Sequence, residues 1–482
     1  DPKINEAYLG GRGIGTKIMW DRVHPEVAPF SPDNLLIFTA GLLDGTFTPA
    51  ANRTFVITKS PMQNWQTYCS FGGFWGPYLK YAGYDSVIIS GKSPTPVYLW
   101  INDDKVELRD ASHLWGKDTF ETQEIIRKEL NNENVQIACI GQAGENRVLC
   151  ASIEHGQGAS ASRGGMGAVM GDKKLKAIAV YGTKDINVAR PDKLYELSDQ
   201  ILKRSDKVRA FIDDVSHTQL VYSLAWATYG NLERQDQTPE GGDINAEFLK
   251  KFSPRRPACY NCQMACKREY VLPGSKSSYV KCVSQYVYWA ALKIKDFEFN
   301  ARFYSRAEGY GFDSVSTCAI LAFAIDLYEK GILTKEDTGM HLEFGNEDIA
   351  FELMRKIAFR EGIGDLLADG VYEAARRIGK GAEQHEYSIK KLEMCFLIPQ
   401  WTYGAFVSAV GDKDILRAAQ YVPQHLFGKS EQFKKEYIDS IWWPYPEEWK
   451  KWGMAPYDPT GGDWERLATM AAWDRDRITA SD

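Results

Sequence analysis

The stretch NLLIFTAG, residues 34–41, is a short apolar run that ends in a glycine, which is typical of a buried β-strand. Similar runs recur through the first 190 residues, separated by glycine and proline turns. Beyond residue 190 the apolar residues follow helical spacing instead. We therefore predict an α+β fold, in which a β-rich domain precedes two mainly α-helical domains. The expected strands are 34–41, 54–60, 86–93, 97–103 and 176–182, and the clearest expected helices are 192–204, 320–333 and 350–363.

Size and composition limit the classes of protein that the chain can belong to. Its 482 residues, 44% of them hydrophobic, can bury the cores of several domains. A net charge of −6, without clustered lysine and arginine, provides no basic surface for nucleic acid. No apolar run reaches the roughly 18–20 residues of a membrane span, and the N-terminus lacks a secretory pattern. Nine unevenly spaced cysteines do not form a disulfide framework, so we expect a cytoplasmic protein.

The segment CYNCQMAC contains the sharpest local signal in the chain. It places Cys259, Cys262 and Cys266 at CxxCxxxC spacing, which lets three thiolates converge on one metal site. Thiolates suit both zinc and a [4Fe–4S] cluster. A fourth ligand is needed, and spacing alone leaves Cys282, Cys318, Cys395 and a cysteine beyond Asp482 as candidates.

Four glycine-rich clusters contain residues that could bind a phosphate or a pterin ring. Glycines let the backbone approach a ligand, and Arg12, Arg53 and Arg163 supply forked donors beside them. Any one cluster is equally explained by a tight turn, and the first lacks the strand-then-helix context of a dinucleotide fingerprint. The clusters are GGRGIG (10–15), GTFTPAANR (45–53), FGGFWGP (71–77) and ASRGGMGAVMGDKKLKA (161–177).

Taken together, these segments resemble the tungsten-containing aldehyde ferredoxin oxidoreductase family. The matching stretches keep the family's order from position 8 to about 390, and several matches in order are far more specific than one motif. They are YLGGRGIGTKIMWD, NRTFVITKSP, GGFWGPYLKYAGYD, RGGMGAVMGDKKLKAI, CYNCQMAC, AEGYGFDSVS and REGIGDLLADGV. The resemblance implies a tungsten or molybdenum bis-pterin, an adjacent [4Fe–4S] cluster, and Mg²⁺ between the pterin phosphates.

The resemblance also implies roles for individual residues. Arg53 is expected between cluster and pterin, Gly72 and Gly73 against one pterin, and Arg163, Gly164 and Gly165 against the other. Glu308 and Asp313, in Glu-x-x-Gly-x-Asp, are expected to accept hydrogen bonds from pterin ring nitrogens, which suits a carboxylate; a solvated helix-face charge is the plain alternative for Glu308. The family's fourth cluster cysteine lies in a distant Asp-x-x-Gly-x-Cys segment that does not occur here, so we expect it beyond Asp482 and expect both chain ends to be incomplete.

Two positions indicate a branch of the family. Members that oxidise aldehydes carry His-Val-Lys-Gly where this chain has Ser388-Ile389-Lys390-Lys391, whereas members resembling the catalytic subunit of class II benzoyl-coenzyme A reductase show Lys-Lys. In that branch a cysteine 23 residues after the first cluster cysteine ligates tungsten, and Cys282 stands at this spacing; a buried free cysteine is its alternative. Lys390 is expected to face the cofactor. His217, near Asp213 and Asp214, is the candidate proton donor, although a lone histidine is more often structural.

We therefore predict an oxidoreductase that passes low-potential electrons to an aromatic or unsaturated acyl-coenzyme A, with a ferredoxin or an iron–sulfur subunit as partner, in a hetero-oligomer or homodimer. Aldehyde oxidation is the alternative within enzymes, and a zinc-stabilised scaffold without cofactor is the alternative of another class. The expected domains are 1–190, which binds the pterins, 191–360, which carries the cluster cysteines, and 361–482, which is incomplete.

Overall fold

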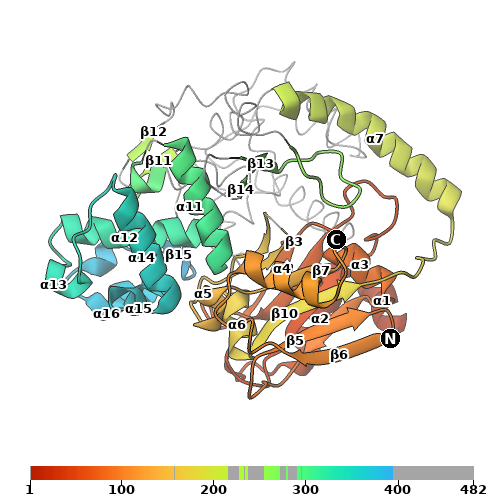
Figure 1. Cartoon of the computed structure of the whole chain (residues 1–482), viewed down its shortest axis with the longest axis horizontal. Coiled ribbons are helices and arrows are strands. Elements are labelled where there is room, and N and C mark those ends of the chain that lie inside the picture. Colours follow the sequence, from red (N-terminus) through yellow and green to blue (C-terminus); the bar gives the residue numbers. More distant parts are fainter. Residues whose placement is uncertain are drawn as a thin grey trace, which may run out of the picture.

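The computed structural model describes residues 2–156, 158–214, 227–232, 234–236, 255–271, 278–280, 290–294 and 296–394. Within them an N-terminal domain of two sheets lies beside a cluster of helices (Figure 1). The α+β class predicted from the sequence is confirmed. No helix in these residues combines the length and apolar character needed to cross a membrane.

The first sheet is antiparallel and has the order β3-β2-β1-β4, and its central strands β1 and β2 are buried on both faces. Because side chains alternate along a strand, Phe38 and Val56 enter the core between the two sheets, while Ile37 and Ile57 pack against helix α2. This double burial explains the continuous apolar runs in the sequence. The elements are α1 (Pro2–Tyr8), α2 (Gly11–Arg22), β1 (Leu36–Ala40), β2 (Thr54–Lys59), β3 (Gln66–Phe71) and β4 (Ser86–Ile89).

The second sheet has the order β6-β5-β10-β7-β8-β9, with β5 and β10 parallel. Helices α3 and α6 contact strands of both sheets and therefore lie between them. Trp75 of α3 is fully buried and donates from Nε1 to the Ile178 carbonyl at 3.1 Å. The elements are α3 (Trp75–Tyr81), β5 (Val97–Asn102), β6 (Lys105–Asp110), α4 (Thr119–Glu129), β7 (Gln136–Cys139), α5 (Gln142–Glu145), β8 (Ile153–His155), β9 (Ala159–Ala161), α6 (Met166–Asp172) and β10 (Leu175–Tyr181).

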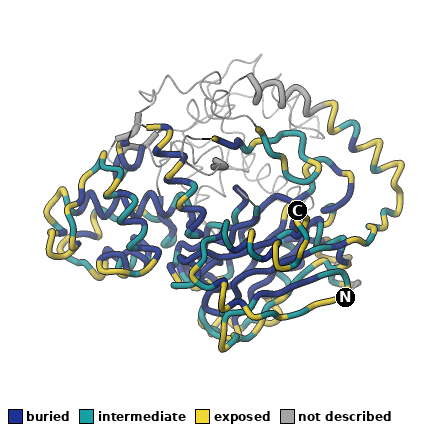
Figure 2. Tube along the Cα trace, in the orientation of Figure 1, coloured by how far each residue is buried: buried dark blue, intermediate teal, exposed yellow. Residues whose placement is uncertain are grey.

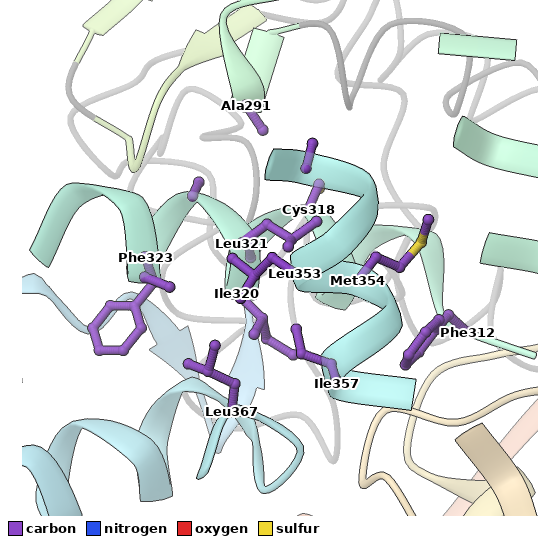
Figure 3. Packing of buried hydrophobic residues seen from close by; sticks show 14 of the residues in the cluster. Ala291, Phe312, Cys318, Ile320, Leu321, Phe323, Leu353, Met354, Ile357 and Leu367 are labelled. Carbon is purple, nitrogen blue, oxygen red and sulfur yellow. The ribbon is translucent and has the colours of Figure 1, made fainter. Parts of the chain in front are cut away.

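The helical cluster is built around α12, which is buried along nearly its whole length (Figure 2). Its residues Ile320 and Leu321 pack with Leu353 and Ile357 of α14 and with Leu367 of α15 (Figure 3). The remaining described elements are α7 (Pro191–Asp214), β11 (Ala227–Tyr229), β12 (Arg234–Asp236), β13 (Arg268–Tyr270), β14 (Ser278–Val280), α11 (Phe297–Tyr310), α12 (Ser314–Glu329), α13 (Lys335–Thr338), α14 (Glu347–Phe359), α15 (Ile363–Leu367), α16 (Gly370–Ile378), η1 (Ala382–His385), β15 (Ser388–Ile389) and β16 (Leu392–Glu393).

A short backbone bridge joins the sheet domain to the helices. Ser152 donates to the Gly311 carbonyl at 2.8 Å, and the amide of Asp313 donates to the Cys150 carbonyl at 2.9 Å. Ala151 and Phe312 form an isolated β-bridge between these bonds. The end of α11 and the start of α12 are thereby fixed against the segment that precedes β8.

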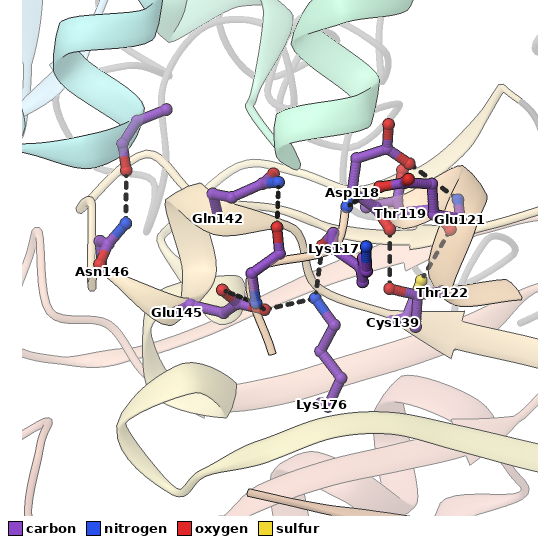
Figure 4. A network of polar contacts seen from close by, with 12 residues as sticks. Lys117, Asp118, Thr119, Glu121, Thr122, Cys139, Gln142, Glu145, Asn146 and Lys176 are labelled. Atoms are coloured by element: carbon purple, nitrogen blue, oxygen red, sulfur yellow. Dashed lines mark hydrogen bonds and ion pairs between the residues drawn. The ribbon is translucent and has the colours of Figure 1, made fainter. Parts of the chain in front are cut away.

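A buried ion pair connects β10 of the second sheet to the end of α5 (Figure 4). Lys176 of β10 is fully buried, and its ammonium donates to Glu145 at 2.5 Å and to the Lys117 carbonyl at 2.8 Å. The amide of Gly116 donates to the same carboxylate at 2.8 Å. An ion pair buried this deeply leaves an uncompensated charge when one partner is removed.

We expect Lys176→Met to destabilise the protein by about 3–5 kcal/mol, because it leaves the Glu145 carboxylate buried without its cation. The measurement is denaturant unfolding followed by circular dichroism. Lys128→Met is the matched control, because Lys128 and Glu124 form a solvent-exposed helical pair that contributes little to stability. Equal unfolding midpoints for the two variants would contradict a stabilising role for the buried pair.

Candidate cofactor site

The cysteine loop, residues 259–266, is docked on the sheet domain by hydrogen bonds to its backbone. Tyr260 donates from its amide to the Gly73 carbonyl at 3.1 Å, and its own carbonyl accepts from Asn52 Nδ2 at 2.9 Å. The Asn261 carbonyl accepts from a backbone amide of the 45–53 segment at 2.8 Å. Two glycine-rich clusters recognised in the sequence therefore support the loop that carries the three cysteines.

Gly72 and Gly73 allow this docking because they leave no room for a side chain. A Cβ on Gly72 would lie 3.0 Å from the Cys259 sulfur. Gly73 has a φ of +116°, and a Cβ there would lie 2.5 Å from the His155 ring. His155 donates from Nδ1 to a β7 carbonyl and accepts from the Phe74 amide at Nε2, at 3.2 Å. Burial lowers the pKa of His155 to about 3, so the ring is neutral.

The backbone at Arg53 is held in place by the Asp44 side chain. The Asp44 carboxyl accepts from the Arg53 backbone amide at 3.1 Å. Burial raises the pKa of Asp44 to about 8, although backbone hydrogen bonds oppose the rise, so this carboxyl is largely protonated at neutral pH. The Arg53 side chain itself is exposed.

The three thiols lie within electrostatic reach of one another and of Arg53. Partial burial of the thiol and then the neighbouring Cys259 and Cys262 raise the pKa of Cys266, whereas Lys267 and Arg53 lower it. Cys259 and Cys262 are half-buried and Cys266 is exposed as a residue. Among the residues that the structure describes, no group of three cysteine, histidine or carboxylate side chains stands in metal-binding geometry.

A second group of expected residues surrounds Arg163, between β9 and α6. The guanidinium is buried and donates to Asp313 Oδ2 and to Ser316 Oγ, both at 3.2 Å, and to the Glu393 carbonyl. Gly164 and Gly165 follow with φ values of +109° and +77°. Thr67 approaches Gly164, and its hydroxyl is buried and has no hydrogen-bond partner in the part of the chain that the structure describes.

Asp313 and Glu308 are both buried, which contradicts a solvated helix face for Glu308. Asp313 is the N-cap of α12 and accepts from the Val315 amide at 3.3 Å. Glu308 accepts from the Tyr304 hydroxyl at 2.8 Å. Both carboxylates thus already have partners within the protein.

Lys390 lies in the two-residue turn of the hairpin formed by β15 and β16. Lys390 and Lys391 have φ values of +54° and +65°, a left-handed conformation that glycine or asparagine adopts more readily. Lys391 is held by Glu373 at 2.7 Å and by the ring of Tyr372. A strained turn that is clamped in this way is typical of a functional segment.

Some candidates lie elsewhere. His217, Cys282 and Cys395 lie outside the described residues, as do the side chains of Asp213 and Asp214. Cys318, one of the candidates for the fourth cluster ligand, is fully buried in the helical core and donates to the Val315 carbonyl at 3.0 Å (Figure 3). Spacing could not exclude Cys318, but its place in the apolar core does.

Sequence reasoning missed several residues that build the site. Asp44, His155 and Tyr260 support the cysteine loop and its neighbours, while Ser316 and Glu393 hold Arg163. The signal that could have identified these residues is their place next to a motif in the sequence. Asp44 adjoins a glycine-rich cluster, Tyr260 lies within the cysteine motif, and Glu393 lies two residues after the lysine pair. Their residue types alone carry no specific signal.

The described residues fit a metallopterin and a thiolate-bound cluster. Three thiols share one loop, the glycines at 72, 73 and 164 pack closely against neighbouring side chains, and the Thr67 hydroxyl beside Gly164 is buried with no hydrogen-bond partner among the described residues. Arginines 53 and 163 provide positive charge for anionic groups. The three thiols and the two arginines are the donor types that a metal- and cofactor-dependent oxidoreductase uses.

Comparisons with known proteins specify the family. Residues 1–182 match the family description "Aldehyde ferredoxin oxidoreductase, N-terminal domain", and residues 193–452 match "Aldehyde ferredoxin oxidoreductase, domains 2 & 3". The tungsten-containing aldehyde ferredoxin oxidoreductase of Pyrococcus abyssi is 36% identical over 413 residues, which are 82% of this chain and 67% of that protein. The chain belongs to the aldehyde ferredoxin oxidoreductase family, which implies a tungsten or molybdenum pterin.

Two further relatives carry other names. The WOR-like subunit of an aliphatic sulfonate oxidoreductase from Pyrococcus furiosus is 32% identical over 421 residues, covering 80% of this chain and 66% of that subunit. A solved structure titled "Active site complex BamBC of Benzoyl Coenzyme A reductase in complex with 1,5 Dienoyl-CoA" is similar with a TM-score of 0.89 and 41% identity, over 98% of this chain and 76% of that one. The resemblance to a benzoyl-coenzyme A reductase subunit is thereby confirmed.

We expect Gly73→Ala to lower both the stability and the bound iron or zinc, because a Cβ at this position collides with His155 beneath the cysteine loop. Melting temperature and metal content per chain are the measurements. Gly91→Ala is the control: Gly91 also has positive φ, but no atom of the described residues lies within 4 Å of its Cβ position, so the backbone cost of about 1 kcal/mol remains. Equal metal content in the two variants would show that close packing at Gly73 does not hold the loop.

Proposed function

We propose that this chain is the catalytic subunit of a tungsten bis-pterin, [4Fe–4S] oxidoreductase that transfers low-potential electrons to an aromatic or unsaturated acyl-coenzyme A. The observation that carries the proposal is the likeness to the benzoyl-coenzyme A reductase complex, which extends over 98% of this chain. That complex contains a dienoyl-coenzyme A. Family membership alone supports the wider class of reaction but not this substrate.

Two sequence positions support the same branch. Cys282 stands 23 residues after Cys259, the spacing at which that branch donates a thiolate to tungsten. A thiolate ligand adds electron density to a metal and favours reduction at low potential. Ser388 occupies the position of the histidine that aldehyde-oxidising members carry. The site therefore lacks one group that the alternative reaction uses.

The proposed roles follow from the chemistry of each side chain. When bound, the metallopterin and the cluster supply the electron transfer. Cys259, Cys262 and Cys266 would hold the cluster together with a fourth ligand, and Arg53 would lie between cluster and pterin. Residues proposed to face the two pterins are Gly72, Gly73, Arg163, Gly164, Gly165, Glu308, Asp313 and Lys390, and Mg²⁺ would bridge the pterin phosphates.

Electrons and protons must enter this site separately. A ferredoxin or an iron–sulfur subunit would deliver electrons to the cluster, and the complex found among the similar structures favours a hetero-oligomer over a homodimer. His217 would donate a proton to the substrate as a general acid. The chain's own contribution is to orient cofactor and substrate and to supply that proton.

Aldehyde oxidation is the second candidate function. It is favoured by 36% identity to tungsten-containing aldehyde ferredoxin oxidoreductases over more than four fifths of this chain. A zinc-stabilised scaffold without cofactor is a candidate of a different class, because three thiolates also suit zinc. The persistence of four separate glycine-rich motifs argues against that scaffold.

Elemental analysis of anaerobically purified protein distinguishes the enzyme from the scaffold. We expect tungsten or molybdenum together with about four iron atoms per chain, since a cubane cluster contains four irons. Iron is measured alongside zinc in the same digest. Zinc without either heavy metal would overturn the catalytic proposal.

Cys282→Ser tests the branch. We expect dye-linked reduction of an acyl-coenzyme A to fall by at least about 100-fold, because changes outside the direct ligands already cost 10–100-fold. Cys69→Ala is the control, since Cys69 is buried in the sheet domain's core. Aldehyde oxidation that persists unchanged in Cys282→Ser, without acyl-coenzyme A turnover in the parent protein, would favour the second candidate function.

A further inference from the structure

Four buried residues from distant parts of the chain form one closed network. Arg163 donates to Asp313 Oδ2 and to Ser316 Oγ, both at 3.2 Å. Ser316 Oγ lies 2.8 Å from Asp313 Oδ2 and 2.7 Å from Glu393 Oε2. Glu393 Oε1 accepts from the Val371 amide at 3.3 Å. Glu393 is fully buried, and its carbonyl also accepts from Arg163.

The hydrogen atoms available to this network fix its protonation. A serine hydroxyl donates one hydrogen bond and accepts two. Ser316 Oγ faces two carboxyl oxygens, so its single proton cannot serve both of them. With two ionised carboxylates, one anionic oxygen would face a hydroxyl lone pair at hydrogen-bond distance in a buried site, which is costly. One of the two carboxyls must therefore carry a proton.

The surroundings assign that proton to Glu393. Asp313 accepts from the Arg163 guanidinium and caps α12, so a cation and the N-terminus of a helix both face this carboxyl group. Burial raises the pKa of Glu393, which Arg163 and Ser316 offset only in part, while Asp313 raises it further. The other titratable group that interacts with Glu393 among the described residues is the Cys150 thiol, whose pKa burial also raises. When Glu393 carries the proton, Ser316 Oγ donates to Asp313 and accepts from Glu393 and Arg163, so each of its contacts has one donor and one acceptor.

We propose that Glu393 is a positioning residue that enters this network as a neutral carboxylic acid and holds Arg163 and Asp313 in place for the cofactor. The acid donates to Ser316, Ser316 donates to Asp313, and Arg163 donates to both. This inference rests on the proposed function, in which Arg163 and Asp313 face a pterin.

The charge balance gives Glu393 a role that a plain packing residue lacks. Within this group of four residues, a neutral Glu393 leaves the cation of Arg163 paired with the carboxylate of Asp313. An ionised Glu393 would leave a buried excess negative charge beside a cradle for anionic phosphate and dithiolate groups. Like charges at close range inside a protein repel strongly. The proton on Glu393 thus removes a negative charge that would repel the anionic groups of the cofactor.

Three variants of the anaerobically purified holoenzyme test the proposal. Glu393→Gln imitates the neutral acid, because its amide can donate to Ser316 and accept from Val371, so it should keep the parent's melting temperature and tungsten content. Glu393→Met, similar in length but apolar, should lower both. Asp313→Asn should also lower both, because its amide turns a donor toward Arg163 and Ser316. Infrared difference spectra of parent minus Glu393→Gln should show the stretch of a protonated carboxyl, shifted in D₂O.

The reverse order would overturn the proposal. A Glu393→Gln protein that is destabilised as strongly as Asp313→Asn, or a difference spectrum of parent minus Glu393→Gln without the protonated-carboxyl band, means that Glu393 is ionised. Failure of the proposed function is seen separately, as a parent protein that contains neither tungsten nor molybdenum. In that event the melting temperatures and infrared spectra still decide the protonation of Glu393, since both are measurable without cofactor.

Discussion

The backbone bridge between residues 150–152 and 311–313 is the constraint on which the candidate site depends. It brings the start of α12 against the segment before β8, and only glycines permit this approach. A Cβ on Gly141 would lie 2.5 Å from the Gly309 carbonyl, and one on Gly167 would lie 2.4 Å from the Ser152 carbonyl. Since α6 follows Arg163 directly, this contact sets Arg163 opposite Asp313. Without this close backbone contact, Arg163 and Asp313 would lie farther apart.

Much of the fold could be predicted from the sequence because its central strands are buried on both faces. The runs 34–41 and 54–60 became β1 and β2, and helical spacing located α7, α12 and α14. The strand β6 escaped prediction because it alternates polar and apolar residues at an edge and exposes Leu108. GGRGIG showed no strand-then-helix context, and it forms the first turns of α2, ahead of the first strand.

The site was predictable only where motifs mark it. Arg163 and Asp313 were found through ordered motifs, whereas Ser316 and Glu393 were missed, because a contact across 77 residues leaves no local pattern. Cys318 illustrates the opposite error. Its residue type suits a metal ligand, but its position on α12 places it among apolar side chains. Residue type and spacing limit the ligand candidates, and only the fold distinguishes a ligand from a core residue.

A common electrostatic rule connects the two halves of the site. The groups that support the cysteine loop, His155 and Asp44, are kept neutral by burial, which lowers one pKa to about 3 and raises the other to about 8. In the second half, the charge of Arg163 is matched by a single carboxylate if Glu393 is neutral. His155 and Asp44 therefore add no net charge to the site. The exposed cation of Arg53 lowers the pKa of Cys266, and neither of these two supporting residues opposes that effect. An interior arranged in this way can accept anionic cofactors without first removing charge of its own.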